Sequence, residues 1–188
     1  RPGEDDWNDR LGFVRSGGSR GGALQYIDDE TSSYSAILDN AHGTVSESDK
    51  KKVITALLNL SNGTALERYF DVDEILRYFA AHTVVVSLDS YYSNMAQNYF
   101  LQERDGQISI LPWDYHLSYG AFQSGSAKEV VNFAIDTPVS GVAMEDRPLL
   151  NVLLSDDEYL AKYHGYLQQI VDGYFNSGIF EQTVRDLQ

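Results

Sequence analysis

The sequence predicts an α+β fold that is mainly helical and has one central β-hairpin. Three helix-start signals, each with apolar residues near it, lie between residues 46 and 86. After them, Asp105-Gly106 separates two β-prone runs, and two more helix-start signals follow from residue 148 onward. The chain has 188 residues, 43% of them hydrophobic, which is enough to form the core of one domain or of one large lobe.

The first two helices are predicted from capping patterns. Ser46-x-x-Asp49 is a helix start, and Asn62-Gly63 is a stop signal. The residues between them include the apolar side chains Val53, Ile54, Leu57 and Leu58. Thr64-x-x-Glu67 then predicts the start of a short second helix.

A third helix is predicted from Asp71-x-x-Glu74. Its apolar residues recur at i, i+3, i+4 and i+7 and would form one buried face: Val72, Ile75, Leu76 and Phe79. The helix leads through Val84-Val85-Val86 towards Asp89. His82 lies within it and is expected to be a satisfied core histidine or a helix-surface histidine, because no zinc-binding spacing links the histidines of this chain.

The hairpin strands are predicted at Tyr99–Arg104 and Gln107–Leu111. Asp105-Gly106 between them favours a two-residue type I′ turn. The register set by such a turn would bring Asn98 and Asp114 side by side at the open end of the hairpin.

The C-terminal part is predicted to begin with a loop and to end in helices. Residues 118–146 show no sustained periodicity and are expected to form a long surface loop of the kind that usually carries function. Pro148 fits a helix start, and Ser155-x-x-Glu158 predicts a longer helix. Its core positions would be Tyr159, Tyr163, Leu167, Ile170 and Tyr174.

Charge and composition exclude several classes of function. Acidic residues number 28 against 14 basic ones, and the net charge of −14 argues against nucleic acid as a partner. A nucleotide would still bind if a divalent cation lay between carboxylates and phosphates. The chain has no cysteine, which excludes disulfides and thiolate nucleophiles, and no G-x-S-x-G motif of a serine hydrolase. No apolar run reaches the roughly 18 residues that a membrane span needs.

Three polar residues surround the predicted hairpin: Asp89 before it, Asn98 at its entrance and Asp114 at its exit. Protein-kinase catalytic lobes present their base and their two metal ligands in this order. The spacing differs, because Asp89 is nine residues from Asn98 and no H-R-D or D-F-G motif occurs. Alternatively, Asp89 is a turn residue at a helix end and Asn98 a hydrogen-bonding residue at a strand edge. A buried Asp114 would need a partner or a metal ion.

Five stretches of the sequence, in order, carry a further pattern: Gly22–Glu30, Asp71–Ala80, Asn98–Leu101, Leu111–Asp114 and Glu145–Leu150. Together they resemble the CotH (spore-coat protein H) kinase family. The resemblance implies an atypical, mainly helical protein-kinase-like C-terminal lobe. It further implies an enzyme that uses ATP and Mg²⁺ to phosphorylate Ser or Thr of secreted or coat proteins, located outside the cell, on its surface or on the spore coat.

Carried over position by position, the resemblance implies a role for each polar residue. Asp89 would be the catalytic acid that orients the hydroxyl, and Asn98 and Asp114 would bind Mg²⁺. Trp113 would stack on adenine or serve as a core residue. His116 stands where the family pattern has a second Asp, so it would either weaken a second metal contact or be a surface residue.

The resemblance also bears on domain organisation, because the family carries an N-terminal lobe with a nucleotide-anchoring Lys. Residues 1–23 are interpreted as a linker or remnant of that lobe, with Arg15–Gly22 as a Gly-rich loop or hinge. Residues 24–188 would be a single catalytic lobe, which alone could bind metal and lack activity. Lys50-Lys51-Lys52 lies on a predicted polar helix face and is a poor substitute for the missing Lys.

Two other functions stay open. A non-catalytic surface or scaffold module would keep the fold for binding another protein and would give no metal-dependent nucleotide binding. A metal-dependent hydrolase using the same acids would release phosphate without labelling a protein.

Overall fold

The computed structural model describes residues 22–39, 41–43 and 45–187. Over these residues the chain is mainly helical, and its strands form one two-stranded antiparallel sheet. The predicted α+β class is therefore confirmed. Apart from Gly22, the Gly-rich stretch Arg15–Gly22 lies outside the described residues, as does most of the predicted linker.

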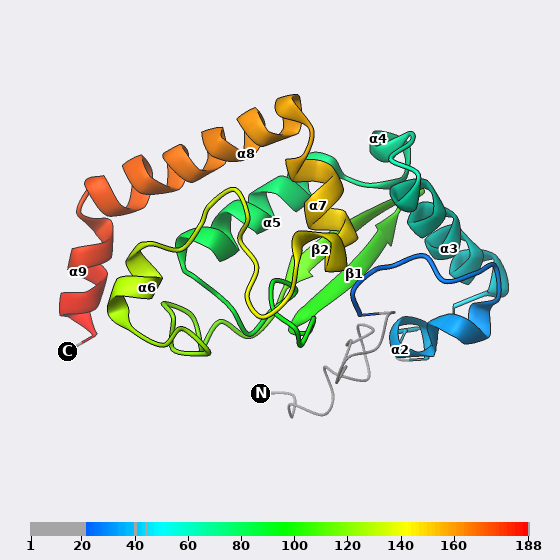
Figure 1. The fold of residues 1–188 in the computed structure, drawn as a ribbon, viewed down its shortest axis with the longest axis horizontal. Helices are drawn as coiled ribbons and strands as arrows, with labels where there is room; N and C mark the ends of the chain where they lie inside the picture. The colour runs from blue at the N-terminus through cyan, green and yellow to red at the C-terminus, as the bar shows by residue number, and fades with distance from the viewer. Residues whose placement is uncertain (1–21, 40, 44, 188) are drawn as a thin grey trace.

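The elements follow one another in three groups. The first holds η1 (Thr31–Tyr34), α2 (Ser35–Leu38), α3 (Glu47–Ser61), α4 (Leu66–Tyr69) and α5 (Val72–Val84), and the second is the hairpin of β1 (Tyr99–Arg104) and β2 (Gln107–Pro112). The third holds α6 (Ala127–Val131), η2 (Met144–Asp146), α7 (Pro148–Leu154), α8 (Asp157–Ile170), the π-helix η3 (Val171–Asn176) and α9 (Ile179–Asp186). The hairpin lies at the centre and α8 runs along α5, while α2 and α3 lie at one end and α6 and α9 at the other (Figure 1).

Helix α5 is the centre of the core. The carboxylate of Asp71 caps it by accepting a hydrogen bond from the Glu74 amide at 3.0 Å, as the capping pattern predicts. The predicted apolar face is buried, and Ile75, Leu76 and Phe79 have no exposed surface. Helices α7 and α8 and strand β2 all contact α5. Burial of these apolar side chains is the main force that assembles the lobe.

The hairpin has the predicted register, with Arg104 opposite Gln107 and Tyr99 opposite Pro112. Both turn residues have positive φ, 54° at Asp105 and 90° at Gly106, as a type I′ turn requires. The ladder runs one step past the strands, because the Trp113 amide donates to the Asn98 carbonyl at 3.2 Å.

Two helix starts differ from the prediction. Helix α4 is preceded by Ala65 in a left-handed conformation, and the hydroxyl of Thr64 binds the side chain of Asn59 instead of capping the helix. Helix α8 is capped by Asp156 and not by Ser155, because the Asp156 carboxylate accepts from the amides of the next turn at 2.9 and 3.1 Å. A carboxylate is a strong acceptor for these unpaired amides and suits the positive end of the helix dipole.

The long loop and the end of α8 also needed correction. Residues 118–146 contain the short helices α6 and η2, and α6 begins with a capping box of Ser126 and Glu129 that the search for periodicity missed. In α8, Tyr163 and Leu167 are buried as predicted, whereas Tyr159 and Ile170 are only partly buried and pack against the core. Tyr174 is only partly buried, because α8 ends at Ile170 and the chain continues as a π-helix whose wider turn changes the helical spacing.

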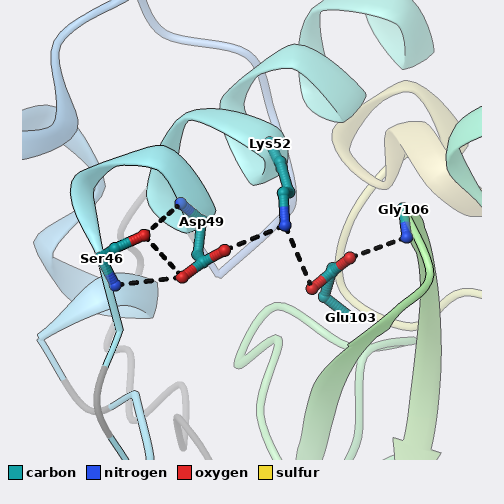
Figure 2. A network of polar contacts seen from close by, with 5 residues as sticks. All are labelled: Ser46, Asp49, Lys52, Glu103 and Gly106. Atoms are coloured by element: carbon teal, nitrogen blue, oxygen red, sulfur yellow. Dashed lines mark hydrogen bonds and ion pairs between the residues drawn. The ribbon is translucent and has the colours of Figure 1, made fainter.

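The start of α3 joins the helix to the tip of the hairpin (Figure 2). The Ser46 hydroxyl accepts from the Asp49 amide, and the Asp49 carboxylate accepts from the Ser46 amide, which is the predicted capping box. The hydrogen bond from Ser46 and the ion pair with Lys52 lower the pKa of Asp49 to about 2. The Nζ of Lys52 also lies 3.9 Å from Oε2 of Glu103 in β1.

Replacing Ser46 by Ala is expected to lower the free energy of unfolding by about 1 kcal/mol, because the α3 capping box is lost. Urea unfolding followed by circular dichroism would measure the change. Ser48→Ala is the matched control, since Ser48 is exposed within the first turn and is not the cap. Equal midpoints for the two variants would contradict a stabilising cap.

His82 lies in the core, as one of the two predicted alternatives had it, but it is not fully hydrogen-bonded. Its Nδ1 lies 3.1 Å from the Tyr78 carbonyl oxygen and 3.3 Å from the Tyr115 hydroxyl. No hydrogen-bond partner for Nε2 exists within the described part of the chain. The ring packs against those of Tyr78, Tyr92 and Tyr115. Burial lowers the pKa of His82 from 6.5 to about 3.

This buried neutral imidazole predicts a loss of stability in mild acid. Below pH 6.5 the unfolded chain binds a proton that folded His82 does not, so stability falls by about 1.4 kcal/mol per pH unit as pH drops towards 3. Chemical unfolding would measure the free energy of unfolding at pH 7.0 and at pH 4.5. The difference between these two free energies should be smaller for His82→Phe than for the wild type. The exposed His42 supplies the control, and His42→Gln should keep the wild-type difference.

Candidate active site

Asp89 lies in a tight turn sequence that follows α5. Two hydrogen bonds cap the C-terminal end of α5: the Val85 amide donates to the Ala81 carbonyl, and the Val86 amide donates to the Thr83 carbonyl. Asp89 is only 8% exposed, and its Oδ1 accepts a hydrogen bond of 2.5 Å from the Gln97 side chain. One carboxylate oxygen, Oδ1, is thus held in place by the protein.

Asn98 contacts Asp89 directly. Its Nδ2 donates to the main-chain carbonyl of Asp89 at 2.8 Å, and the side chain is 6% exposed. The residues from Asp89 to Asn98 therefore form a closed loop whose two ends touch, although nine positions separate them. The side-chain amide nitrogen is used in this bond, and Oδ1 is the acceptor atom of the Asn98 side chain.

Hydrogen bonds inside this loop hold its shape. The amides of Ser93 and Gln97 both donate to the Ser90 carbonyl at 3.4 Å, and the Ala96 amide donates to the Ser93 carbonyl at 3.2 Å. The Ser90 hydroxyl donates to the Ser87 carbonyl at 2.5 Å. A compact loop of this kind presents Asp89 and Asn98 in a fixed relation to each other.

The loop is also attached to the start of the described chain. The Tyr91 hydroxyl donates to the Ala23 carbonyl at 3.0 Å, and the Tyr99 hydroxyl donates to the Gly22 carbonyl at 2.5 Å. Both tyrosine side chains are fully buried. The segment at Gly22 therefore packs against the core that supports the loop.

Asp114 lies one residue beyond the last rung of the hairpin ladder. It is exposed and has a left-handed backbone, with φ of 55°. Its Oδ1 contacts the Nδ1 of His116 and also accepts from the His116 amide at 3.3 Å. Its backbone thus follows directly after the Trp113–Asn98 rung, while its carboxylate faces His116.

Trp113 packs on the hairpin. Its ring meets the buried ring of Phe100 edge to face, with 5.4 Å between ring centroids, and the side chain is half-buried. This contact is consistent with a packing role for Trp113 on the hairpin.

Left-handed backbone conformations occur at several of these residues, as they do elsewhere in the described chain. Besides Asp114, positive φ occurs at Val86 (43°), Ala96 (45°) and Asn98 (57°). Such a conformation costs a non-glycine residue about 1–2 kcal/mol, and most for a β-branched one such as Val86. Strain of this kind is found most often at functional sites, where the surrounding structure maintains it.

The oxygen donors of the site fit Mg²⁺, which prefers carboxylate and amide oxygens. Asn98 offers Oδ1, and Asp114 offers Oδ2 besides the oxygen that contacts His116. Within the described residues, no group of three or more His, Asp and Glu side chains is close enough to hold a metal ion. A cation here would therefore also need water or phosphate oxygens, as Mg²⁺ commonly does.

Sequence reasoning missed two residues that contact the site from its surroundings. Gln97 binds the Asp89 carboxylate, and no local pattern marks it. Arg147 binds carbonyl groups of the loop from more than 50 positions away. Arg147 lies within the stretch Glu145–Leu150, so the resemblance was a signal of a constraint there but not of its nature.

A helical lobe with an acid after its central helix, an amide before a hairpin and an acid after it has the organisation of a kinase-like protein. The family model described as "CotH kinase protein" matches residues 13–188, and the chain belongs to this family. The family suggested by the sequence motifs is thereby confirmed. A comparison with curated proteins found no match. In the part of the chain that the structure describes, no helix is both long and apolar enough to traverse a bilayer.

Proposed function

We propose that this chain is the catalytic lobe of an atypical protein kinase that transfers the γ-phosphoryl group of ATP to Ser or Thr of a protein substrate. The observation that carries the proposal is the contact between Asp89 and Asn98, because the 2.8 Å bond joins two residues that phosphoryl transfer needs close together. Membership of the CotH kinase protein family supports the same reaction.

Each residue of the site has a proposed role. Asp89 orients the substrate hydroxyl through Oδ2 and accepts its proton, while Gln97 keeps the carboxylate from rotating. Asn98 and Asp114 would hold Mg²⁺, which when bound neutralises phosphate charge. The accessible part of Trp113 would contact the adenine ring. A chain with a net charge of −14 repels a free nucleotide, so binding of ATP should depend on the cation.

The substrate class and location are part of the proposal. We propose coat or surface proteins as substrates, as the sequence resemblance to spore-coat protein H kinases implies, and we place the enzyme outside the cell, on the cell surface or on the spore coat. An exposed serine or threonine in an extended segment would reach Asp89, which is only slightly exposed, more readily than one in a helix.

The test uses the full-length protein that contains residues 1–188. Titration calorimetry with ATP should show binding in the presence of Mg²⁺ and none with EDTA. Asp114→Asn should weaken Mg-ATP binding at least about tenfold, or about 1.4 kcal/mol. Asp105→Asn is the matched control, since it makes the same change in charge at the far end of the hairpin, where Asn also suits the turn.

The contact between His116 and Asp114 favours a second candidate, a surface or scaffold module that keeps the fold without catalysis. The imidazole occupies one oxygen of the proposed metal ligand. This alternative expects no Mg²⁺-dependent heat with ATP from the wild type, and no transfer of labelled phosphate to protein. Mg²⁺-dependent binding together with labelling would reject it, whereas phosphate release without labelling would indicate a hydrolase.

A further inference from the structure

Arg147 is a buried charged residue that the proposed reaction does not use. It is 4% exposed and immediately precedes α7. Its Nε donates to the Tyr91 carbonyl at 2.7 Å and to the Ser93 carbonyl at 3.1 Å, and its Nη2 also donates to the Ser93 carbonyl. Nη1 donates to the Asp146 carbonyl at 2.6 Å.

These partners are unusual for a buried arginine, which normally pairs with a carboxylate. Burial lowers the pKa of Arg147, but a guanidinium stays protonated in proteins, so a full positive charge is held by main-chain oxygens. Hydrogen bonds from an ionised donor are about twice as strong as neutral ones. The contact with the loop is thus a strong one.

The two carbonyls lie inside the closed loop between Asp89 and Asn98. They are two positions apart, and one planar guanidinium bridges them. The Ser93 carbonyl also accepts the Ala96 amide, so Arg147 holds the same oxygen that shapes the left-handed residue Ala96.

Neighbouring contacts attach the same loop to the region before α7. The Leu149 amide donates to the Tyr91 hydroxyl at 3.2 Å, and the Ser140 amide donates to the Tyr92 carbonyl at 3.1 Å. The segment from Ser140 to Leu149 therefore covers one side of the loop, and Arg147 supplies its charged contact.

We propose that Arg147 is a positioning residue for phosphoryl transfer, which holds the loop so that Asp89 and Asn98 keep their mutual geometry. The inference rests on the proposed function of those two residues. Arg147 does not touch the reacting groups and acts through the backbone of the loop. A lysine would keep the charge but lacks the planar fork that spans two carbonyls.

The experiment compares Arg147→Lys and Arg147→Met with the wild-type full-length protein. For the folded fraction, kcat is expected to fall about tenfold in Arg147→Lys and about a hundredfold in Arg147→Met, with the KM for ATP within about twofold. Hydrogen exchange of the Ala96 amide should become at least about tenfold faster in both variants.

Leu153→Ala supplies the control for a merely structural role. Leu153 is fully buried in α7 and has an apolar side chain, so this variant lowers the thermal midpoint without removing a hydrogen bond of the loop. It should leave kcat of the folded fraction and Ala96 exchange near the wild-type values. An unchanged Ala96 exchange rate in both Arg147 variants, or equal losses of kcat in Leu153→Ala, would overturn the inference. Absence of labelling by the wild type would overturn the proposed function alone, and the exchange rates would still decide whether Arg147 holds the loop.

Discussion

Replacing Asp89 by Asn is expected to lower kcat for phosphoryl transfer by about 10²–10⁴-fold while leaving the affinity for Mg-ATP within about threefold. The substitution keeps an oxygen at the position of Oδ1, so the bond from Gln97 is preserved and the loop should not rearrange. What is lost is the negative charge that orients the hydroxyl and takes its proton. Initial rates of labelled phosphate transfer at saturating Mg-ATP would measure the effect.

The charge-matched control is Asp105→Asn, at the opposite end of the hairpin from Asn98. It should label the substrate protein at the wild-type rate. Equal rates for the wild type and Asp89→Asn would show that Asp89 is not the base. Loss of Mg-ATP binding in Asp89→Asn would instead indicate that the Asp89 carboxylate binds the metal ion.

The features predicted correctly from the sequence depend on local signals. The capping residues of α3 and α5 lie within four positions of the amides they bind, and the turn Asp105-Gly106 alone sets the hairpin register. A short-range hydrogen bond or turn requirement needs no knowledge of the remaining fold. The same reasoning explains why α6 could have been found from Ser126-x-x-Glu129.

The site was harder to predict, because its geometry depends on contacts across the chain. The order of Asp89, Asn98 and Asp114 suggested a function, yet the spacing of nine residues gave no indication that the first two touch. The bond of Arg147 to Tyr91 spans 56 positions, and no pattern in the sequence specifies it. Non-local contacts of this kind form only once the core has brought the segments together.

Asp114 shows where register and side-chain direction separate. The hairpin ladder continues through Trp113, which pairs with Asn98, so the backbone of Asp114 follows directly after the last rung. The left-handed backbone at Asp114 and the contact with His116 then orient the carboxylate towards the His116 ring. Period-two alternation predicts faces only within a regular strand, so it could not predict the residue that follows its end.

Replacing Phe79 by Ala is expected to lower the free energy of unfolding by about 3–5 kcal/mol. Phe79 has no exposed surface, and its ring packs 6.4 Å from that of Tyr91 and 5.9 Å from that of Tyr92, measured between centroids. Both tyrosines belong to the loop between Asp89 and Asn98. The cavity would therefore open between α5 and the loop, and the typical net stability of a domain, about 5–15 kcal/mol, would fall by about a fifth or more.

Two further variants separate cavity formation from other effects in the same unfolding experiment. Phe79→Leu keeps most of the volume and should cost less than about 1.5 kcal/mol, whereas Val131→Ala, at a position 81% exposed, should change stability by under about 0.5 kcal/mol. A cost below about 1 kcal/mol for Phe79→Ala would mean that α5 does not anchor the loop. The Tyr92 hydroxyl donates to the main-chain carbonyl of Phe79 at 2.7 Å, so this hydrogen bond can form in Phe79→Ala and in Phe79→Leu. Any loss of stability therefore reports on ring packing, the same packing that joins the helix to the residues proposed for catalysis.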